Sequence, residues 1–377
     1  MLWAAVWLTF YARLRPIWPA SGRWLLLSGV VLSYNLLIVW RHLPANHRHD
    51  ETALLPTLGP GNALTLVRGL CIGLLAGFLF GPWPHGLLAW VIVLLYTLTD
   101  VADYFDGYLA RRAHHVTLLG GVLDMEFDGL GTLVVILLAV SFGQLPWWYL
   151  ALGLARYLFM FGLWLRGRLG LPIHDLAPSV HRRVFAGLQM GFLSVVLWPI
   201  LPRSMAVIAG TLFALATGLG FVRDWFVASG RLNPVDSGYR QVQQRLYHTF
   251  AIVLPLLWRP LLFIALVSIF LAAPPLPAPA AWQSLLREWG VPRPPLFALL
   301  IALIGFTGAI LVILGILPRV LAVALTLPIG FDMATRGLVW DNALALVCIV
   351  MIQLFGSGPF ALWPVEEHFM FQRLGER

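Results

Sequence analysis

The sequence contains no lysine: each of its 25 basic residues is an arginine. That absence indicates a compositional bias of the genome before it indicates a function. Charged residues of both signs make up only 11% of the 377 residues, whereas soluble domains carry about 25%. With 60% hydrophobic residues and a mean hydropathy of +0.83, so little charge excludes an ordinary soluble domain and predicts a polytopic membrane protein.

Cysteine is also scarce. Both cysteines, Cys71 and Cys348, lie in apolar runs, so the sequence supports neither a disulfide framework nor a thiolate metal site. The formal charge of +8 fits a membrane protein that retains its arginines on the cytoplasmic side and meets anionic lipid headgroups. This charge requires no nucleic acid as a partner.

The most informative stretch runs from Asp103 to Asp128 and joins two apolar runs that are helical in character. Asp103 and Asp106 stand at the end of the first run, Asp124 and Asp128 at the start of the second, and the basic segment 111–117 is the predicted turn. Residues three or four positions apart share one face of a helix. If the two helices pack antiparallel, four carboxylates converge at one membrane surface.

Four clustered carboxylates repel one another and are costly at the edge of a bilayer unless a cation neutralises them. Oxygen ligands of this kind suit Mg²⁺ or Mn²⁺, with substrate phosphates completing the coordination shell. Gly107 and Ala110 remove side-chain bulk beside Asp106, and Arg111 adds a guanidinium suited to phosphate. The stretch therefore predicts metal-assisted phosphoryl chemistry.

The same residues resemble the signature of the CDP-alcohol phosphotransferase family. That signature reads Asp, two residues, Asp-Gly, two residues, Ala-Arg, eight residues, Gly, three residues, Asp, three residues, Asp, and the sequence matches it throughout. The resemblance implies a membrane enzyme that moves a phosphatidyl or related phospho-alcohol group from a CDP-linked donor, such as CDP-diacylglycerol, to an alcohol and releases CMP. The alternative, that the carboxylates merely cap and solvate a loop, requires no fixed spacing across the turn.

The resemblance also implies roles for individual residues. Two divalent ions would be held by the carboxylates, and Asp128 would be the general base. The implied metal ligands are Asp103, Asp106, Asp124 and Asp128, and the implied nucleotide-binding residues are Asp103, Gly107, Ala110 and Arg111.

A second part of the resemblance begins at Pro60 and ends at Arg68. It is similar to the Pro-Asn-x-x-Thr-x-x-Arg entry of the family's first core helix, with Gly61 inserted between the proline and the asparagine. The resemblance implies that Asn62 and Thr65 contribute to the nucleotide site. A helix N-cap formed by Asn62 explains that residue equally well.

Further basic residues are candidates for binding the acceptor. Arg156 lies inside a predicted span, where an arginine is a functional candidate by default. Arg182, Arg183 and Gln189 resemble a basic residue and a glutamine of the family that are thought to meet the acceptor's phosphate. Retention of arginines on the cytoplasmic side explains Arg182 and Arg183 as well, and the sequence does not decide between the two explanations.

The C-terminal part resembles the four-helix DoxX-like membrane family, chiefly in segments 281–292 and 308–319. A glutamate usual in that family is replaced near Gly305, and Asp332 and Asp341 are expected to be loop residues rather than ligands. A polar linker at 227–248 separates this part from the rest. The predicted division is 1–54 for the N-terminal interfacial and membrane helices, 55–235 for the CDP-alcohol phosphotransferase domain, and 236–377 for the DoxX-like domain.

The sequence thus predicts an all-α membrane protein with a six-helix catalytic core, an N-terminal helix and a C-terminal four-helix bundle. The expected location is the cell membrane with the site facing the cytoplasm, because the loop arginines concentrate on that side when the spans are counted. The expected partners are the CDP-linked donor, the alcohol acceptor, membrane lipids and a second copy in a homodimer. The alternative function is a non-catalytic DoxX-like membrane partner or subunit of a redox complex.

Overall fold

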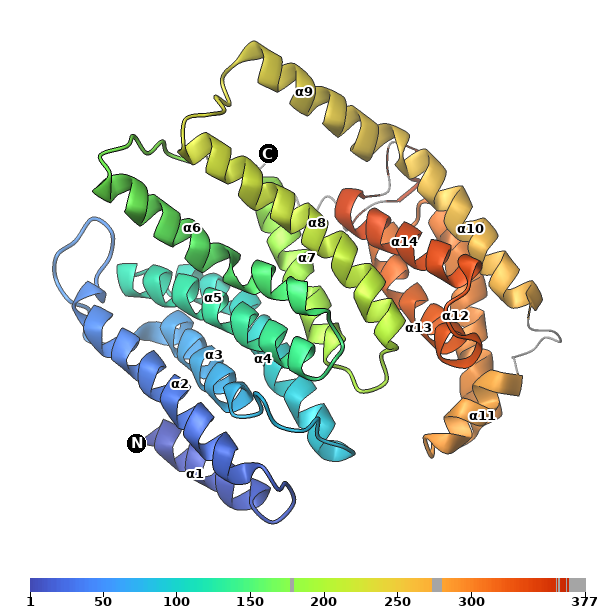
Figure 1. The fold of residues 1–377 in the computed structure, drawn as a ribbon, viewed down its shortest axis with the longest axis horizontal. Coiled ribbons are helices and arrows are strands. Elements are labelled where there is room, and N and C mark those ends of the chain that lie inside the picture. Colours follow the sequence, from blue (N-terminus) through green and yellow to red (C-terminus); the bar gives the residue numbers. More distant parts are fainter. Residues whose placement is uncertain (177–179, 273–279, 357, 359, 364, 366–377) are drawn as a thin grey trace. The chain divides into compact units, whose positions relative to one another are not determined.

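The structure is a computed structural model that describes residues 1–176, 180–272, 280–356, 358, 360–363 and 365. Throughout these ranges the secondary structure elements are helices (Figure 1), which confirms the all-α prediction. Seven helices of the described chain are long and apolar enough to cross a membrane, by length and composition. In chain order the helices are α1 (Leu2–Leu14), α2 (Ser21–His42), α3 (Gly59–Ala76), α4 (Leu87–Arg112), α5 (Leu118–Ser141), α6 (Leu150–Arg168), α7 (Val180–Val196), α8 (Arg203–Ala228), α9 (Ser237–Tyr247), α10 (Pro255–Ala272), α11 (Ala280–Glu288), α12 (Pro294–Leu314), α13 (Pro318–Arg336) and α14 (Trp340–Phe355).

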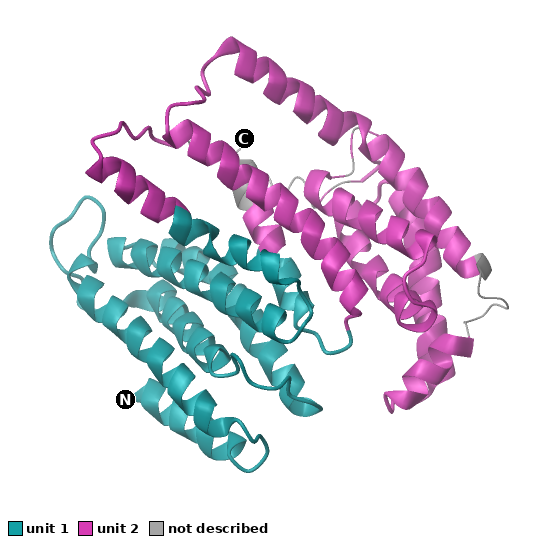
Figure 2. Ribbon diagram, viewed as in Figure 1, with its two compact units in different colours: residues 1–158, 190–200 teal, residues 159–189, 201–377 magenta. Residues whose placement is uncertain are grey.

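The chain divides into two compact units (Figure 2). The first consists of Met1–Leu158 and Met190–Ile200, and the second of Phe159–Gln189 and Leu201–Arg377. The division predicted from the sequence is based on changes in composition, whereas the two compact units are defined by which residues pack together. The helices of the predicted catalytic segment are α3 to α8, which agrees with a six-helix core.

Helix α3 is the centre of the first unit, because it packs against α2, α4 and α5. Its residues from Cys71 to Ala76 are all buried, so little of this part of the helix is left for lipid. Helix α1 packs on α2, where the Trp7 indole donates to Ser28 at 2.8 Å and the rings of Phe10 and Trp24 stack 4.9 Å apart. A helix buried on several sides can carry a polar residue without exposing it to lipid.

The second unit contains the predicted four-helix bundle. Helices α10, α12, α13 and α14 pack pairwise, and the short helix α11 packs on α12 and α13. Trp282 and Leu286 of α11 are buried against Ala298 and Ile301 of α12, which explains how an amphipathic helix of nine residues keeps its place.

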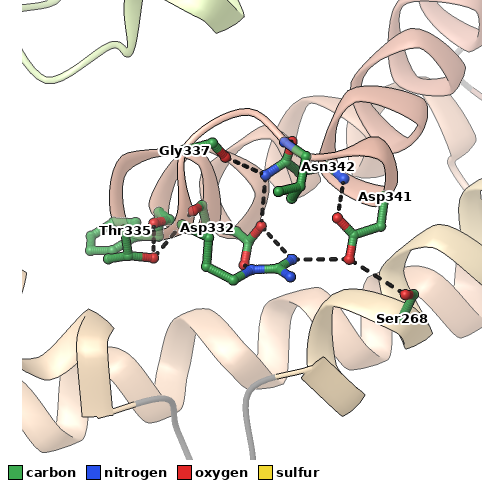
Figure 3. Close-up of polar contacts among 9 residues, drawn as sticks. Ser268, Asp332, Thr335, Gly337, Asp341 and Asn342 are labelled. Carbon is green, nitrogen blue, oxygen red and sulfur yellow. Dashed lines mark hydrogen bonds and ion pairs between the residues drawn. The ribbon is translucent and has the colours of Figure 1, made fainter.

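A buried polar network ties α13 to the first turn of α14 (Figure 3). Arg336 donates to both oxygens of Asp332 at 2.6 and 2.7 Å and to Asp341 at 3.0 Å. Asn342 donates to Asp332 at 2.9 Å, and Ser268 of α10 lies 3.4 Å from Asp341. Asp332 and Asp341 are buried within helices, so their expected placement in loops is wrong. Asp332 and Arg336 are four residues apart on α13, a spacing that already predicts an ion pair, whereas the contact of Arg336 with Asp341 depends on the α13–α14 turn.

Substituting Asp332→Asn should destabilise the second unit by about 1.5–3 kcal/mol, because it removes the buried carboxylate that accepts two charge-assisted hydrogen bonds from the partly buried Arg336. The two buried cysteines report on the units separately, since Cys348 lies on α14 and Cys71 on α3. On mild heating, Asp332→Asn should speed thiol labelling of Cys348 and leave labelling of Cys71 unchanged. The matched control is Asp175→Asn at an exposed position, and equal labelling of Cys348 in the two variants contradicts the prediction.

The segment 227–248 differs from its prediction as a polar linker. It contains α9, and a π-helical turn from His248 to Val253 connects α9 to α10. The polar residues of the segment predict a linker, but apolar side chains also recur within it at helical spacing.

Candidate active site

Two helices bring the four motif carboxylates together. Asp103 and Asp106 lie within α4, and Asp124 and Asp128 lie in the first half of α5. Thr117 caps the start of α5 by accepting from the amide of Gly120 at 3.0 Å, which fixes where that helix begins. The convergence expected from the spacing is therefore present.

The residue between these carboxylates is Arg68, which comes from α3 and whose side chain is fully buried. Its Nη1 donates to Asp106 at 2.8 Å and to Asp124 at 2.7 Å. Its Nη2 contacts Asp103 at 2.6 Å and also Asp128. Each nitrogen thus joins one carboxylate of α4 to one of α5, and α3 connects the two halves of the motif.

Sequence reasoning did not include Arg68 among the site residues. A signal was present, because Arg68 ends the pattern of the first core helix and is followed by an apolar run. An arginine within a membrane helix is a functional candidate by default.

The charges at this site are not balanced by the arginine alone. One guanidinium compensates one of the four carboxylates, and Arg68 contacts a single oxygen of each. Oxygen atoms of Asp103, Asp106 and Asp124 lie within 4.8 Å of one another. A cluster of hard, negatively charged oxygens fits Mg²⁺ or Mn²⁺, and the residues present therefore suit the divalent ions that the resemblance implies.

Two further side chains of α3, Thr65 and Asn62, connect this helix to α4 and to the start of α5. The Thr65 hydroxyl lies 3.0 Å from Asp106 and 3.2 Å from the carbonyl oxygen of Gly61. The Asn62 amide donates to the Thr117 hydroxyl at 3.0 Å and so connects α3 to the start of α5. The N-cap interpretation of Asn62 is wrong, because α3 begins at Gly59 and Asn62 lies inside its first turn.

Gly61 and Ala110 let α3 and α4 approach closely beside the carboxylates. A Cβ atom at Gly61 would lie 2.7 Å from the Cβ of Ala110 and 2.8 Å from the carbonyl oxygen of Asp106. Small residues at a membrane helix interface permit this kind of backbone contact. The contact gives Ala110 a packing role in addition to the nucleotide-binding role that the resemblance implies.

Arg111 extends over the glycine of the motif. Its Nη1 would lie 3.2 Å from a Cβ atom at Gly107, so the missing side chain leaves room for the guanidinium. Arg111 is exposed, whereas Asp106 is buried. This arrangement leaves a fork of donors available at the surface beside the carboxylates.

Of the residues predicted to bind the acceptor, Arg156 has a described contact beside the motif carboxylates. Arg156 of α6 donates to the carbonyl of Met125 and lies 3.5 Å from Glu126, so it stands beside the acidic segment of α5. Gln189 of α7 is buried and belongs to the second compact unit. Arg182 and Arg183 are within α7, but their side chains lie outside the described part of the structure.

A fifth carboxylate stands one turn before the motif. Asp100 of α4 accepts a hydrogen bond from Ser194 of α7, and both residues belong to the first unit. Asp100 lies three residues before Asp103, at the spacing that places side chains on one helix face. This residue was not among the predicted site residues because the motif begins at Asp103.

Comparison with known proteins agrees with this geometry. Residues 60–222 match the family model described as CDP-alcohol phosphatidyltransferase, and the match covers every motif residue described above. Residues 60–222 belong to the CDP-alcohol phosphotransferase family. No solved structure matches the chain.

Curated relatives of the CDP-alcohol phosphotransferase segment carry two different names. Proteins named putative cardiolipin synthase from Mycobacterium bovis and Mycobacterium tuberculosis are 27% identical over 140 residues, which cover 36% of this chain and 63% of theirs. A protein named CDP-diacylglycerol–glycerol-3-phosphate 3-phosphatidyltransferase from Cereibacter sphaeroides is 33% identical over 108 residues, covering 27% of this chain and 47% of that protein. The chain thus spans less than two thirds of the length of these relatives.

The family match ends at residue 222, before the predicted DoxX-like domain begins. The match lies within the segment 55–235 predicted for the catalytic domain. The resemblance of the C-terminal part to DoxX-like proteins stays a prediction.

Proposed function

We propose that this protein is a CDP-alcohol phosphotransferase that transfers a phosphatidyl or related group from CDP-diacylglycerol, or another CDP-linked donor, to an alcohol. The observation that carries the proposal is the convergence of all four motif carboxylates on Arg68. A non-catalytic membrane partner has no need to keep such a cluster. An assay for CMP release from CDP-diacylglycerol tests the proposal, and the absence of release with every acceptor overturns it.

In the proposed reaction the acceptor oxygen forms a bond to the donor's β-phosphorus, and the bond from that phosphorus to CMP breaks. Asp128 accepts the proton of the acceptor hydroxyl, so the attacking oxygen carries more negative charge. Arg68 holds Asp128 beside Asp103 and holds Asp106 beside Asp124, which keeps the carboxylates oriented. Arg111 and the space above Gly107 suit the phosphates of the nucleotide.

Divalent ions, held by Asp103, Asp106, Asp124 and Asp128, would neutralise the negative charge of the pyrophosphate. We therefore expect a chelator to abolish CMP release and an excess of Mg²⁺ or Mn²⁺ to restore it. The physical reason is that Arg68 contacts all four carboxylates but brings a single positive charge, which cannot balance four negative ones. Full CMP release in metal-free buffer contradicts this prediction.

The names of the relatives indicate which alcohols to test first as acceptors. Glycerol 3-phosphate is named as the acceptor of the Cereibacter sphaeroides relative, and an anionic acceptor suits the exposed Arg111 and the nearby Arg156. A screen of alcohols with labelled CDP-diacylglycerol should therefore begin with glycerol 3-phosphate, inositol phosphate and phosphatidylglycerol. Arg156→Gln should raise the KM for a phosphorylated acceptor more than the KM for the donor.

We further propose that the protein acts in the cell membrane with its site facing the cytoplasm and forms a homodimer. The support for the orientation is the concentration of loop arginines on one side of the predicted spans. Labelling of an introduced cysteine beside Arg111 from each side of sealed vesicles tests the orientation.

A further inference from the structure

The carboxylate of Asp100 on α4 is hydrogen-bonded through one oxygen only. Its Oδ2 accepts from the hydroxyl of Ser194 on α7. Its Oδ1 is buried and has no hydrogen-bond partner among the described residues. A buried carboxylate oxygen without a donor is costly, because folding removes it from water and returns nothing in exchange. The oxygen therefore indicates a donor that does not belong to the chain.

A second buried polar group lies one helical turn away, on the same face of α4. Tyr96 is four residues before Asp100 and only 1% exposed, and its hydroxyl also lacks a partner among the described residues. The groups within electrostatic range of this hydroxyl are Asp100, Asp103, Asp128 and Arg68. Tyr96 thus directs an O–H group out of the helix packing toward the carboxylates.

Asp100 lies on the side of the site where the acceptor is expected. It is three residues further from the α4–α5 turn than Asp103, whereas Arg111, which suits the phosphates of the nucleotide, is next to that turn. Asp128 is the motif carboxylate whose charge acts most strongly on Asp100. Because Asp128 is the proposed general base, the unpartnered oxygen lies beside the group that takes the proton of the acceptor.

The packing of α7 on α4 holds the Asp100 carboxylate in place. The rings of Trp90 and Trp198 meet edge to face with their centres 5.8 Å apart, which joins the two helices beyond Ser194. A serine hydroxyl has a single proton to donate, and Ser194 donates it to Oδ2, so the same hydroxyl cannot also satisfy Oδ1. A carboxylate fixed through one oxygen presents the other in a defined direction, as a binding group requires.

The two unpartnered groups together select a hydroxyl. The Tyr96 O–H donates, and the Oδ1 atom of the Asp100 carboxylate accepts. The oxygen of one hydroxyl can accept from Tyr96 and donate to Asp100, so a single group satisfies both. An ammonium group only donates and gives the tyrosine proton no acceptor, and a methylene group satisfies neither side chain.

We propose that Tyr96 and Asp100 form a subsite for a second hydroxyl of the acceptor, next to the hydroxyl that attacks the phosphorus. The acceptor class that fits is a vicinal diol, such as a glycerol group or an inositol ring, and not an amino alcohol. Ser194 is a positioning residue, because it acts through Asp100. This inference rests on the proposed transferase function and adds the class of acceptor to it.

The test compares two acceptors that differ by one hydroxyl. Glycerol 3-phosphate carries hydroxyls on adjacent carbons, whereas 3-hydroxypropyl phosphate keeps the reacting hydroxyl and the phosphate but lacks the second hydroxyl. The full chain in lipid nanodiscs, with CDP-diacylglycerol as donor, is assayed for the kcat/KM of CMP release with each. The parent should prefer glycerol 3-phosphate by about 10- to 100-fold, because the analogue leaves a buried charged group unpaired. Where phosphatidylglycerol is the active acceptor, its analogue without the secondary hydroxyl takes the place of 3-hydroxypropyl phosphate.

Four variants separate binding of the second hydroxyl from a structural role. Tyr96→Phe keeps the buried ring and Asp100→Asn keeps the shape of the side chain, and each should reduce the preference about tenfold by lowering kcat/KM for glycerol 3-phosphate. Ser194→Ala should reduce it less, because Asp100 is still present. The matched control is Thr99→Val, which removes a buried hydroxyl that donates to the Leu95 carbonyl of the same helix at 3.0 Å and should keep the parent's preference.

The ratio between the two acceptors decides the outcome, because a loss of packing lowers both values of kcat/KM by the same factor. The inference is overturned if the parent uses both acceptors equally well, or if Tyr96→Phe and Asp100→Asn both keep the parent's preference. In either case CMP is still released, so the proposed transferase function stands. If the parent releases no CMP with any acceptor, the proposed function is overturned and this inference with it.

Discussion

Replacing Arg68 with methionine is expected to lower the melting temperature of the solubilised chain and to reduce CMP release at least about 100-fold. The buried guanidinium is the one cation that contacts Asp103, Asp106, Asp124 and Asp128 together among the described residues. Its removal leaves carboxylates that repel one another, and breaking a buried ionic group in this way costs about 3–5 kcal/mol. Displacing catalytic groups by about 1 Å is enough to cost about 100-fold in rate.

The effect of divalent ions separates a charge defect from simple misfolding. A ligand that binds only the folded chain stabilises it, so Mg²⁺ should raise the melting temperature of Arg68→Met more than that of the parent. Arg68→Lys is the matched control, since it keeps the charge but cannot bridge two pairs of carboxylates as a planar fork. It should retain more stability than Arg68→Met and still lose turnover. Parent-like turnover in Arg68→Met would show that the arginine is not part of the working site.

Asp128→Asn should bind the CDP-linked donor nearly normally and lose about 10²–10⁴ in turnover, the usual worth of a positioned general base. Asp106→Asn should lose metal and nucleotide binding together. The structure supports this contrast, because Asp106 is buried and accepts from both Thr65 and Arg68, whereas Asp128 is partly exposed. The test measures the nucleotide affinity of both variants by calorimetry and compares it with their turnover.

Asp175→Asn, at an exposed position, controls for the loss of one negative charge in that comparison. It should match the parent in both measurements. Equal loss of nucleotide binding in Asp128→Asn and Asp106→Asn would mean that the four carboxylates act as one metal cage. The proton acceptor would then be another group, and Asp100 is the next carboxylate along α4 to examine.

The spacing of the motif was sufficient to predict where its carboxylates lie. Asp103 and Asp106 share a helix face, as do Asp124 and Asp128, because the helical repeat relates residues three and four apart. The position of Arg68 could not be derived in that way. It depends on α3 packing against both α4 and α5, and no local periodicity encodes which helix stands beside a motif.

Asn62 is a second case in which local sequence preference does not predict a tertiary contact. Its residue type suits an N-cap, and that local preference competes with a contact to Thr117, 55 residues further on. The tertiary contact prevails because α3 begins three residues earlier, at Gly59, and carries Asn62 into the helix. A preference for capping gives no information about a partner so distant in sequence.

By itself the sequence determined the all-α membrane class, the helical spans, and the spacing of the motif that places residues 60–222 in their family, because composition and helical repeat are local properties. The tertiary structure alone decided that Arg68 of α3 stands among four carboxylates that belong to α4 and α5. Buried charges require partners, and packing of distant segments decides which partners they meet.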